Sequence, residues 1–149
     1  MLLKEICTPD VVYCSGDTRV LDAARLMRQK HVGDLVVVSD PDDERTPLGV
    51  VTDRDIVVEV LGNGLDPAKT TLASLLHRTV VIADESEDSS AALERMHAHG
   101  VRRLPVVNKH GQLVGILTLD DLLRSFAEQA NGLLGVLAKG RHREQHERR

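Results

Sequence analysis

The 149 residues carry a formal net charge of −4 at pH 7 and are 42% hydrophobic, enough for one domain-sized unit with a sizeable core. Tyr13 and Phe126 are the only Phe, Tyr or Trp residues, so the chain lacks the aromatic platforms on which single-stranded nucleic acids stack. Two cysteines cannot build a disulfide scaffold or a cysteine zinc site, and no apolar run could span a bilayer, so we expect a cytoplasmic protein with reduced thiols.

The first elements of the chain are predicted to be a helical turn, a strand and a helix. The turn covers residues 2–6, and the strand lies at the β-branched pair Val11 and Val12. Thr18 can cap the helix, and Gly33 lies near its end, where a left-handed residue is a favourable stop. The apolar face of this helix comprises Val20, Ala23, Ala24, Met27 and His31.

Two further strands and a second helix complete this unit. Residues 35–38 are apolar at every position, as in strands that are buried on both faces. A polar hairpin at residues 40–45 leads to a strand at residues 48–51, after which Thr52 can cap the closing helix. The apolar face of that helix comprises Ile56, Val57, Val60 and Leu61.

The second half of the chain repeats this order. Leu35 matches Leu104 at an offset of 104 − 35 = 69, whereas residues 49–55 return as residues 115–121 at an offset of 115 − 49 = 66. The first copy therefore carries three extra residues in its polar hairpin, and surface turns tolerate such changes. The second copy comprises a turn at residues 72–76, a strand at 80–82, a helix capped by Asp88 or Ser89 and ending near Gly100, strands at 104–107 and 113–117, and a helix capped by Thr118.

The repeat predicts one α/β globule built from two β-α-β-β-α units. Each copy has roughly 60 residues, too few to fill a core alone. We assign residues 1–65 to the first repeat, residues 66–130 to the second, and residues 131–149 to a helical, basic tail. The last eleven residues carry about +3 against about −7 for the rest, so the tail is interpreted as a solvated end, with attraction to phosphates as the alternative.

Both copies end a strand with Gly, two apolar residues and Thr-x-x-Asp at the start of a helix. The helix N-terminus offers unpaired amides to an anion, and Thr52 or Thr118 adds a hydroxyl there. Asp55 or Asp121 can accept hydrogen bonds from vicinal hydroxyls such as those of a ribose. A single copy would be an ordinary capping arrangement, but two copies at matching positions favour a binding site.

The order of elements and the doubled motif, residues 49–55 and 115–121, resemble a tandem pair of cystathionine-β-synthase (CBS) domains, often called a Bateman module. The resemblance covers about residues 1–128. It implies two repeats related by pseudo-two-fold symmetry, with packed sheets flanked by helices. It also implies a regulatory module without catalysis, which binds adenosine nucleotides (AMP, ADP, ATP or S-adenosylmethionine) between the repeats, commonly forms homodimers, and signals to a separate protein target, as in energy sensing.

Carried over to this sequence, the resemblance assigns two clefts. Asp121 and Asp55 would hold the ribose, and the backbone of the opposite repeat would face the base. Threonine hydroxyls and basic side chains would hold phosphate. In the first cleft Asp121 lies with Thr118, Thr8, Val11 and Val12, and in the second Asp55 lies with Thr52, Thr79 and Val80.

The two clefts differ in charge. Arg102 and Arg103 precede a strand of the second copy where the family often places phosphate-binding residues, whereas the first copy has Gly33 and Asp34 there. A carboxylate at Asp34 should repel a polyphosphate by about 1 kcal/mol or more. The sequence therefore favours the Asp121 cleft as the nucleotide site, although surface salt bridges are an alternative role for both arginines.

Other functions have weaker support in the sequence. A scaffold that keeps the fold but has lost the ligand is the main alternative, because of Asp34 and the missing second basic pair. His97 and His99 point in different directions on a helix, so we expect no metal site and no required cofactor. No phosphate loop or catalytic triad is evident, which disfavours an enzyme. Nucleic-acid binding would rest on the basic tail alone.

Overall fold

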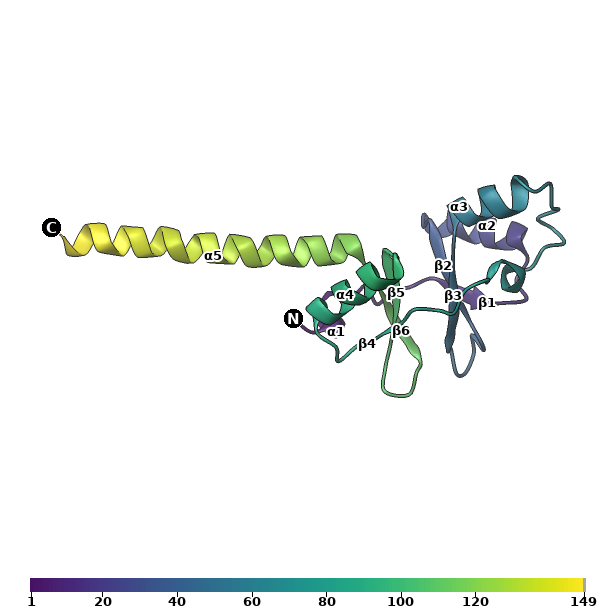
Figure 1. Cartoon of the computed structure of the whole chain (residues 1–149), viewed down its shortest axis with the longest axis horizontal. Coiled ribbons are helices and arrows are strands. Elements are labelled where there is room, and N and C mark those ends of the chain that lie inside the picture. The colour runs from purple at the N-terminus through teal and green to yellow at the C-terminus, as the bar shows by residue number, and fades with distance from the viewer. Residues whose placement is uncertain (149) are drawn as a thin grey trace.

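The computed structural model describes residues 1–148 and confirms the mixed α and β fold with two related units (Figure 1). Each unit has a three-stranded sheet flanked by helices. The elements are α1 (Leu3–Ile6), β1 (Tyr13–Ser15), α2 (Val20–Lys30), β2 (Asp34–Val38), β3 (Pro47–Thr52), α3 (Asp53–Asp55), the π-helix η1 (Ile56–Leu61), the 3-10 helix η2 (Leu72–Leu75), β4 (Ala83–Asp84), α4 (Ser89–His99), β5 (Arg103–Val107), β6 (Leu113–Thr118) and α5 (Leu119–Glu147).

The two sheets have the same topology. In the first, β1 runs parallel to β2, and β2 runs antiparallel to β3; β4, β5 and β6 repeat this arrangement. The central strands β2 and β5 are each buried at four consecutive positions after their first residue. Helices cover one face of each sheet and the sheets pack against each other, which explains the continuous apolar runs.

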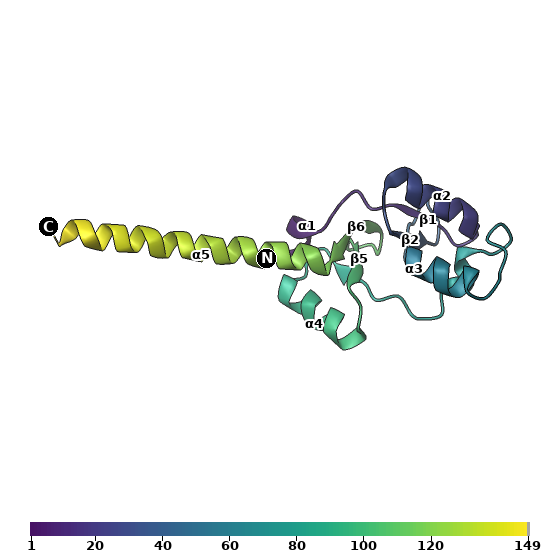
Figure 2. The ribbon, with the colours of Figure 1, turned by 90° about the horizontal axis from the view of Figure 1, so that it is seen from above.

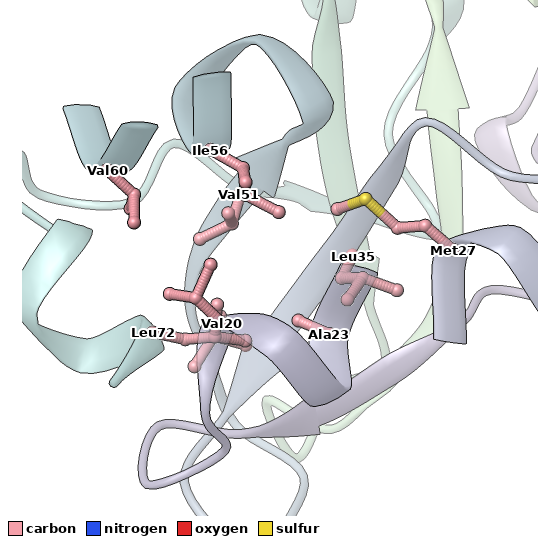
Figure 3. Packing of buried hydrophobic residues seen from close by; sticks show 9 residues of the cluster. Val20, Ala23, Met27, Leu35, Val51, Ile56, Val60 and Leu72 are labelled. Carbon is pink, nitrogen blue, oxygen red and sulfur yellow. The ribbon is translucent and has the colours of Figure 1, made fainter. Parts of the chain in front are cut away.

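The core has three parts. Side chains of α2, β2, β3, η1 and η2 form the first cluster, in which Val20, Leu35 and Leu72 are fully buried (Figure 3). A second cluster joins α4, β5, β6 and the start of α5. A third lies between the sheets and comprises Val36, Val38, Leu113 and Ile116. This third cluster makes the two repeats one packed body.

The repeats exchange their first helical turns. Leu3 of α1 is fully buried in the second cluster, and its amide donates to the carbonyl of Glu87 at 3.0 Å. Leu72 of η2 is fully buried in the first cluster, and its amide donates to the carbonyl of Thr18 at 2.9 Å. Figures 1 and 2 accordingly show α1 beside α5, in the second unit. Each cluster thus requires a side chain from the other half of the sequence.

Several local predictions were wrong by a few residues. The first strands begin later than Val11 and Val80, because the residues before β1 and β4 cross between the repeats instead of lying in a sheet. Helix α2 begins after Arg19, and Thr18 does not cap it. The left-handed residue that ends α2 is His31, with φ of 55°, where α4 uses Gly100 at 64°. Asp88 caps α4, one of the two predicted residues.

Helix α5 is longer than the sequence suggested. It runs for 29 residues without interruption, so residues 133–137 continue the closing helix of the second repeat. Figures 1 and 2 show its far end extending alone, away from both sheets. Arg149, part of the predicted basic tail, lies outside the described residues. Within residues 1–148, no helix is both long and apolar enough to span a bilayer.

Candidate functional site

Both Thr-x-x-Asp motifs form capping boxes at the starts of helices. The Asp55 carboxylate accepts from the Thr52 amide at 2.9 Å, and the Thr52 hydroxyl oxygen accepts from the Asp55 amide at 3.2 Å. Asp121 and Thr118 repeat these bonds at 2.9 and 3.1 Å. One carboxylate oxygen of each Asp is therefore committed to the cap. The other oxygen and the threonine O–H remain suited to a ligand.

A cavity of about 590 Å³ lies beside Asp55. Its walls come from both repeats: Asp55 and Glu59 on one side, Thr79 and Val80 of the crossing segment on the other. Three of the predicted site residues, Asp55, Thr79 and Val80, are thus brought together. The volume lies within the range of about 300–1,000 Å³ that is usual for small-molecule sites.

Arg103 lines this same cavity, contrary to the prediction that it serves the Asp121 cleft. Its Nε lies 2.6 Å from Oδ2 of Asp34, and the two residues stand at equivalent positions of the two repeats. Asp34 is therefore neutralised by a partner and is no free acid facing a ligand. Arg102 is exposed, and its carbonyl accepts from the Leu119 amide at 2.9 Å.

The surroundings of Asp121 offer less space and are more acidic. Thr8 pairs with Ile116 through two backbone hydrogen bonds of 2.9 and 3.0 Å, which draw the crossing segment onto β6. Val11 and Val12 pack against the core clusters. The cavity next to Asp121 has only about 170 Å³, and Thr8, Val11 and Val12 do not line it. Its lining residues are Glu5, Ile6, Asp121, Arg124, Ser125 and Glu128.

Asp121 itself is largely withdrawn from solvent. Its side chain is 9% exposed, and Oδ1 lies 3.6 Å from Nη1 of Arg124. Burial raises the pKa of the neighbouring Cys7 thiol, and a backbone hydrogen bond lowers it by a smaller amount. The negative charges of Asp121 and Glu85 raise this pKa further. A thiol of this kind is a poor nucleophile at neutral pH, because little thiolate is present.

The glycines of the two motifs allow the crossing segments to approach the sheets. A Cβ on Gly115 would lie 2.9 Å from the Thr8 carbonyl oxygen and 2.9 Å from the Cys7 sulfur. A Cβ on Gly49 would meet the Leu76 side chain at 2.6 Å. The absence of a side chain at these two glycines thus lets the crossing segments pack closely on the sheets.

Sequence reasoning missed three basic side chains in the larger cavity. His77, Arg78 and His99 line it together with Arg103. The signal was present at the offset of 69, where residues 77–79 (His-Arg-Thr) correspond to residues 8–10 (Thr-Pro-Asp). The crossing segment of the Asp55 cleft is therefore basic, whereas that of the Asp121 cleft is acidic. Within residues 1–148, no cluster of three or more His, Cys, Asp or Glu side chains could hold a metal ion.

Known proteins share this sequence and architecture. Hypoxic response protein 1 of Mycobacterium tuberculosis is 38% identical over 120 residues, covering 80% of this chain and 81% of that protein. The crystal structure of Hypoxic Response Protein I with two coordinated zinc ions has a TM-score of 0.73 and 34% identity, over 83% of this chain and 98% of that chain. An uncharacterized protein of Methanopyrus kandleri is 31% identical over 80% of this chain, which spans only 60% of that protein.

A further solved structure shows this architecture with ligands. The CBS domain pair of protein MJ0100, in complex with 5′-methylthioadenosine and S-adenosyl-L-methionine, has a TM-score of 0.71 and 25% identity. The alignment covers 85% of this chain and 99% of that chain. The family model of the CBS domain matches twice, at residues 3–62 and 72–128. These two matches span most of the chain and coincide with the repeats, so the chain belongs to the CBS domain family.

Proposed function

We propose that the chain is a regulatory module that binds an adenosine nucleotide in the cavity beside Asp55. The observation that carries this proposal is the meeting, in one space of about 590 Å³, of a ribose-type acceptor with basic side chains from the opposite repeat. Ligand binding there would contact both repeats at once. It would therefore favour one arrangement of the repeats over another, which is all that regulation of a separate target requires.

Each part of the cavity suits one part of such a ligand. The free oxygen of Asp55 can accept hydrogen bonds from ribose hydroxyls. Arg78 and Arg103 line the cavity and can neutralise phosphate. Thr52 does not line it, but its hydroxyl caps the helix of Asp55 and is a further donor close by. The backbone at Thr79 and Val80 offers groups that can pair with a base edge. A nucleoside phosphate needs all three kinds of contact.

The charge of the two clefts supports the Asp55 cleft over the Asp121 cleft, which the sequence had favoured. Glu5 and Glu128 join Asp121 in the smaller cavity, where Arg124 is the single cation, so a phosphate would meet net repulsion. Arg103, the main reason for preferring the Asp121 cleft, lies in the other one. We therefore assign the Asp55 cleft to the anionic ligand and leave the Asp121 cleft empty or weaker.

The class of ligand follows from the family resemblance and from the pair of MJ0100, which holds 5′-methylthioadenosine and S-adenosyl-L-methionine. Candidates are AMP, ADP, ATP and S-adenosylmethionine. The last of these carries a sulfonium and a single carboxylate in place of phosphate, so it gains less than a phosphorylated ligand from Arg78 and Arg103. The two arginines thus favour the phosphorylated ligands.

Matched variants test the proposal. Wild type, Asp55→Asn and Asp121→Asn are melted with each candidate ligand at about a hundredfold excess over its Kd, which adds about 2.7 kcal/mol where binding occurs. Both substitutions alter equivalent capping boxes, so their apo melting temperatures should fall by similar amounts. Asp55→Asn should lose the ligand-induced shift, and Asp121→Asn should keep it. An unchanged shift in Asp55→Asn would overturn the assignment.

A scaffold without ligand is the second candidate, and the Asp34–Arg103 ion pair favours it. In that function Arg103 binds Asp34 permanently and holds the repeats together. The same melting series distinguishes the two functions. No shift with any candidate ligand, in a protein that melts cooperatively, would support the scaffold and direct attention to protein partners.

A further inference from the structure

The far half of α5 has no partner within the described chain. The beginning of the helix is anchored, since Leu122 is fully buried in the second core cluster and Ser125 is 3% exposed. Beyond it, four large apolar side chains are between 58% and 69% exposed: Leu133, Leu134, Val136 and Leu137. Single exposed apolar residues are common, but a group of four on one free helix indicates a contact surface.

This free segment is also a poor helix by itself. Gly132, Gly135 and Gly140 each cost about 1 kcal/mol relative to Ala in an exposed helix. Nothing within 4 Å of their Cβ positions accounts for them by packing inside the chain. In proteins most of the stability of a helix comes from packing of its apolar face rather than from the propensity of its residues. A continuous α5 therefore needs stabilisation from something that packs along it.

Apolar side chains along α5, exposed except for the half-buried Leu119, form a regular stripe. Leu119, Leu123, Phe126, Ala130, Leu133 and Leu137 follow one another at alternating intervals of four and three residues. This is the spacing of a helix that pairs with another helix along a seam. Leu123 and Phe126 are 58% and 36% exposed although they lie in the anchored part of α5. The stripe thus continues from the body to the free half, over about 27 Å at 1.5 Å per residue.

Acidic side chains gather at the anchored end of α5 and basic side chains at its free end, and this distribution favours one direction of a second copy. Asp120, Asp121 and Glu128 lie near the anchored end, together with Glu5 of α1 in the smaller cavity. Toward the free end, Lys139, Arg141, Arg143 and Arg148 outnumber Glu144 and Glu147, whereas Arg124 is the one basic residue among the acids of the anchored end. A second copy running antiparallel would set each basic end against the other copy's acidic base. A parallel copy would place the basic ends together, at a cost that salt only partly screens.

From this geometry we infer that two copies of the chain associate through α5, as an antiparallel pair of helices that covers the stripe. If Ala130 of one copy faces Leu133 of the other across the two-fold axis, then Phe126 faces Leu137, and Leu123 faces Gly140. In two of these layers a small residue faces a leucine, which permits close approach of the helices. The inference goes beyond ligand binding and does not depend on the cavity beside Asp55.

Sedimentation of the full chain without nucleotide tests the association. We expect a dimer for wild type, a monomer for Leu133→Glu, and a dimer for the matched control Ala138→Glu, which places the same charge beside the stripe. Helicity at 222 nm should fall on dilution of wild type as the dimer dissociates. A wild-type monomer at about 100 μM, or a Leu133→Glu protein that remains dimeric, would overturn the inference.

Disulfide trapping tests the direction of the pair. Leu123→Cys and Gly140→Cys proteins with different tags are mixed, oxidised with diamide and separated, with wild type as the control for Cys7 and Cys14. The antiparallel pair predicts the mixed disulfide, because residues 123 and 140 face each other. Efficient Leu123→Cys homodimers without the mixed species would contradict it. These readouts require no nucleotide, so they can fail independently of the proposed ligand site.

Discussion

At the scale of single residues, Arg103 is shared between two possible partners. It lies 2.6 Å from Asp34 and also lines the cavity beside Asp55. A phosphate that enters this cavity competes with the Asp34 carboxylate for the same guanidinium. Both side chains are partly exposed, at 39% and 22%, so the ion pair itself contributes about 1 kcal/mol or less. That is still enough to tune affinity.

Asp34→Asn should therefore tighten the binding of a phosphorylated ligand. Release of Arg103 from a competing carboxylate is expected to lower the Kd for AMP by up to about fivefold, the equivalent of roughly 1 kcal/mol. Calorimetric titration of wild type and variant measures this. Adenosine is the control, since it carries no phosphate and its Kd should not change. Equal tightening for AMP and adenosine would show that Asp34 acts by another route.

The two motif glycines should differ in how well they tolerate a methyl group. Gly115→Ala drives a Cβ against the carbonyl oxygen of Thr8, a residue whose amide and carbonyl are both hydrogen-bonded to Ile116, and should cost about 1–3 kcal/mol. Gly49→Ala meets only the end of the Leu76 side chain, which can rotate away, and should cost less. Urea denaturation of both variants checks the order. Equal losses would mean that Thr8 yields as easily as Leu76.

The sequence predicted the residues of the motif better than it predicted their partners. Thr52 with Asp55, and Thr118 with Asp121, form the capping boxes that the Thr-x-x-Asp spacing indicates. The sequence did not predict that Arg103 lines the cavity beside Asp55, because the position of a residue in a strand does not show which of the two clefts its side chain enters. Only the packing of the two sheets puts Arg103 next to Asp34, 69 positions earlier in the chain.

At the scale of elements, the apolar runs of the central strands and the spacing of the long helices predicted β2, β5, α2 and α4. The short strands β1 and β4 were placed too early, since residues before them are β-branched but cross between repeats. The closing helix of the first repeat also differs from expectation, because it passes from α3 into the π-helix η1. Propensity does not encode such a change of pitch.

The exchanged turns α1 and η2 offer an element-scale test of the shared core. Leu3→Ala and Leu72→Ala each remove a fully buried side chain and should lower the free energy of unfolding by about 2–5 kcal/mol. Leu48→Ala is the matched control, since Leu48 is 43% exposed and should cost far less. Urea unfolding monitored by far-UV circular dichroism gives the three values. A small loss for Leu3→Ala would mean that α1 is not part of the core.

At the scale of the whole molecule, the third cluster between the sheets predicts a single cooperative unfolding transition. Tyr13 lies in the first sheet, so its fluorescence reports on the first repeat, whereas circular dichroism reports on all helices. The two signals should change at the same urea concentration. In Leu3→Ala both should shift together, although Leu3 lies in the second cluster. Separate transitions would show that the repeats unfold independently.

The internal repeat was sufficient to predict the overall architecture, because two copies of one pattern restrict the ways in which the strands can pair. It was insufficient to predict the asymmetry of the clefts. Thr8 is bonded to Ile116, yet within residues 1–148 no equivalent bridge joins His77 to Val50. The difference between the two clefts depends on contacts of the crossing segments, and the nearly identical Thr-x-x-Asp motifs do not reveal these contacts.

The exchange of α1 and η2 also sets an order on the making of the protein at the ribosome. The first repeat cannot close its core until Leu72 has emerged, and Leu3 finds its place only after Leu122 of the second core has been synthesised. At about 5–20 residues per second, the 119 residues from position 4 to position 122 take roughly 6–24 s. The first turn of the nascent chain therefore remains unpacked until the last strand, β6, and the first turn of α5 have been translated.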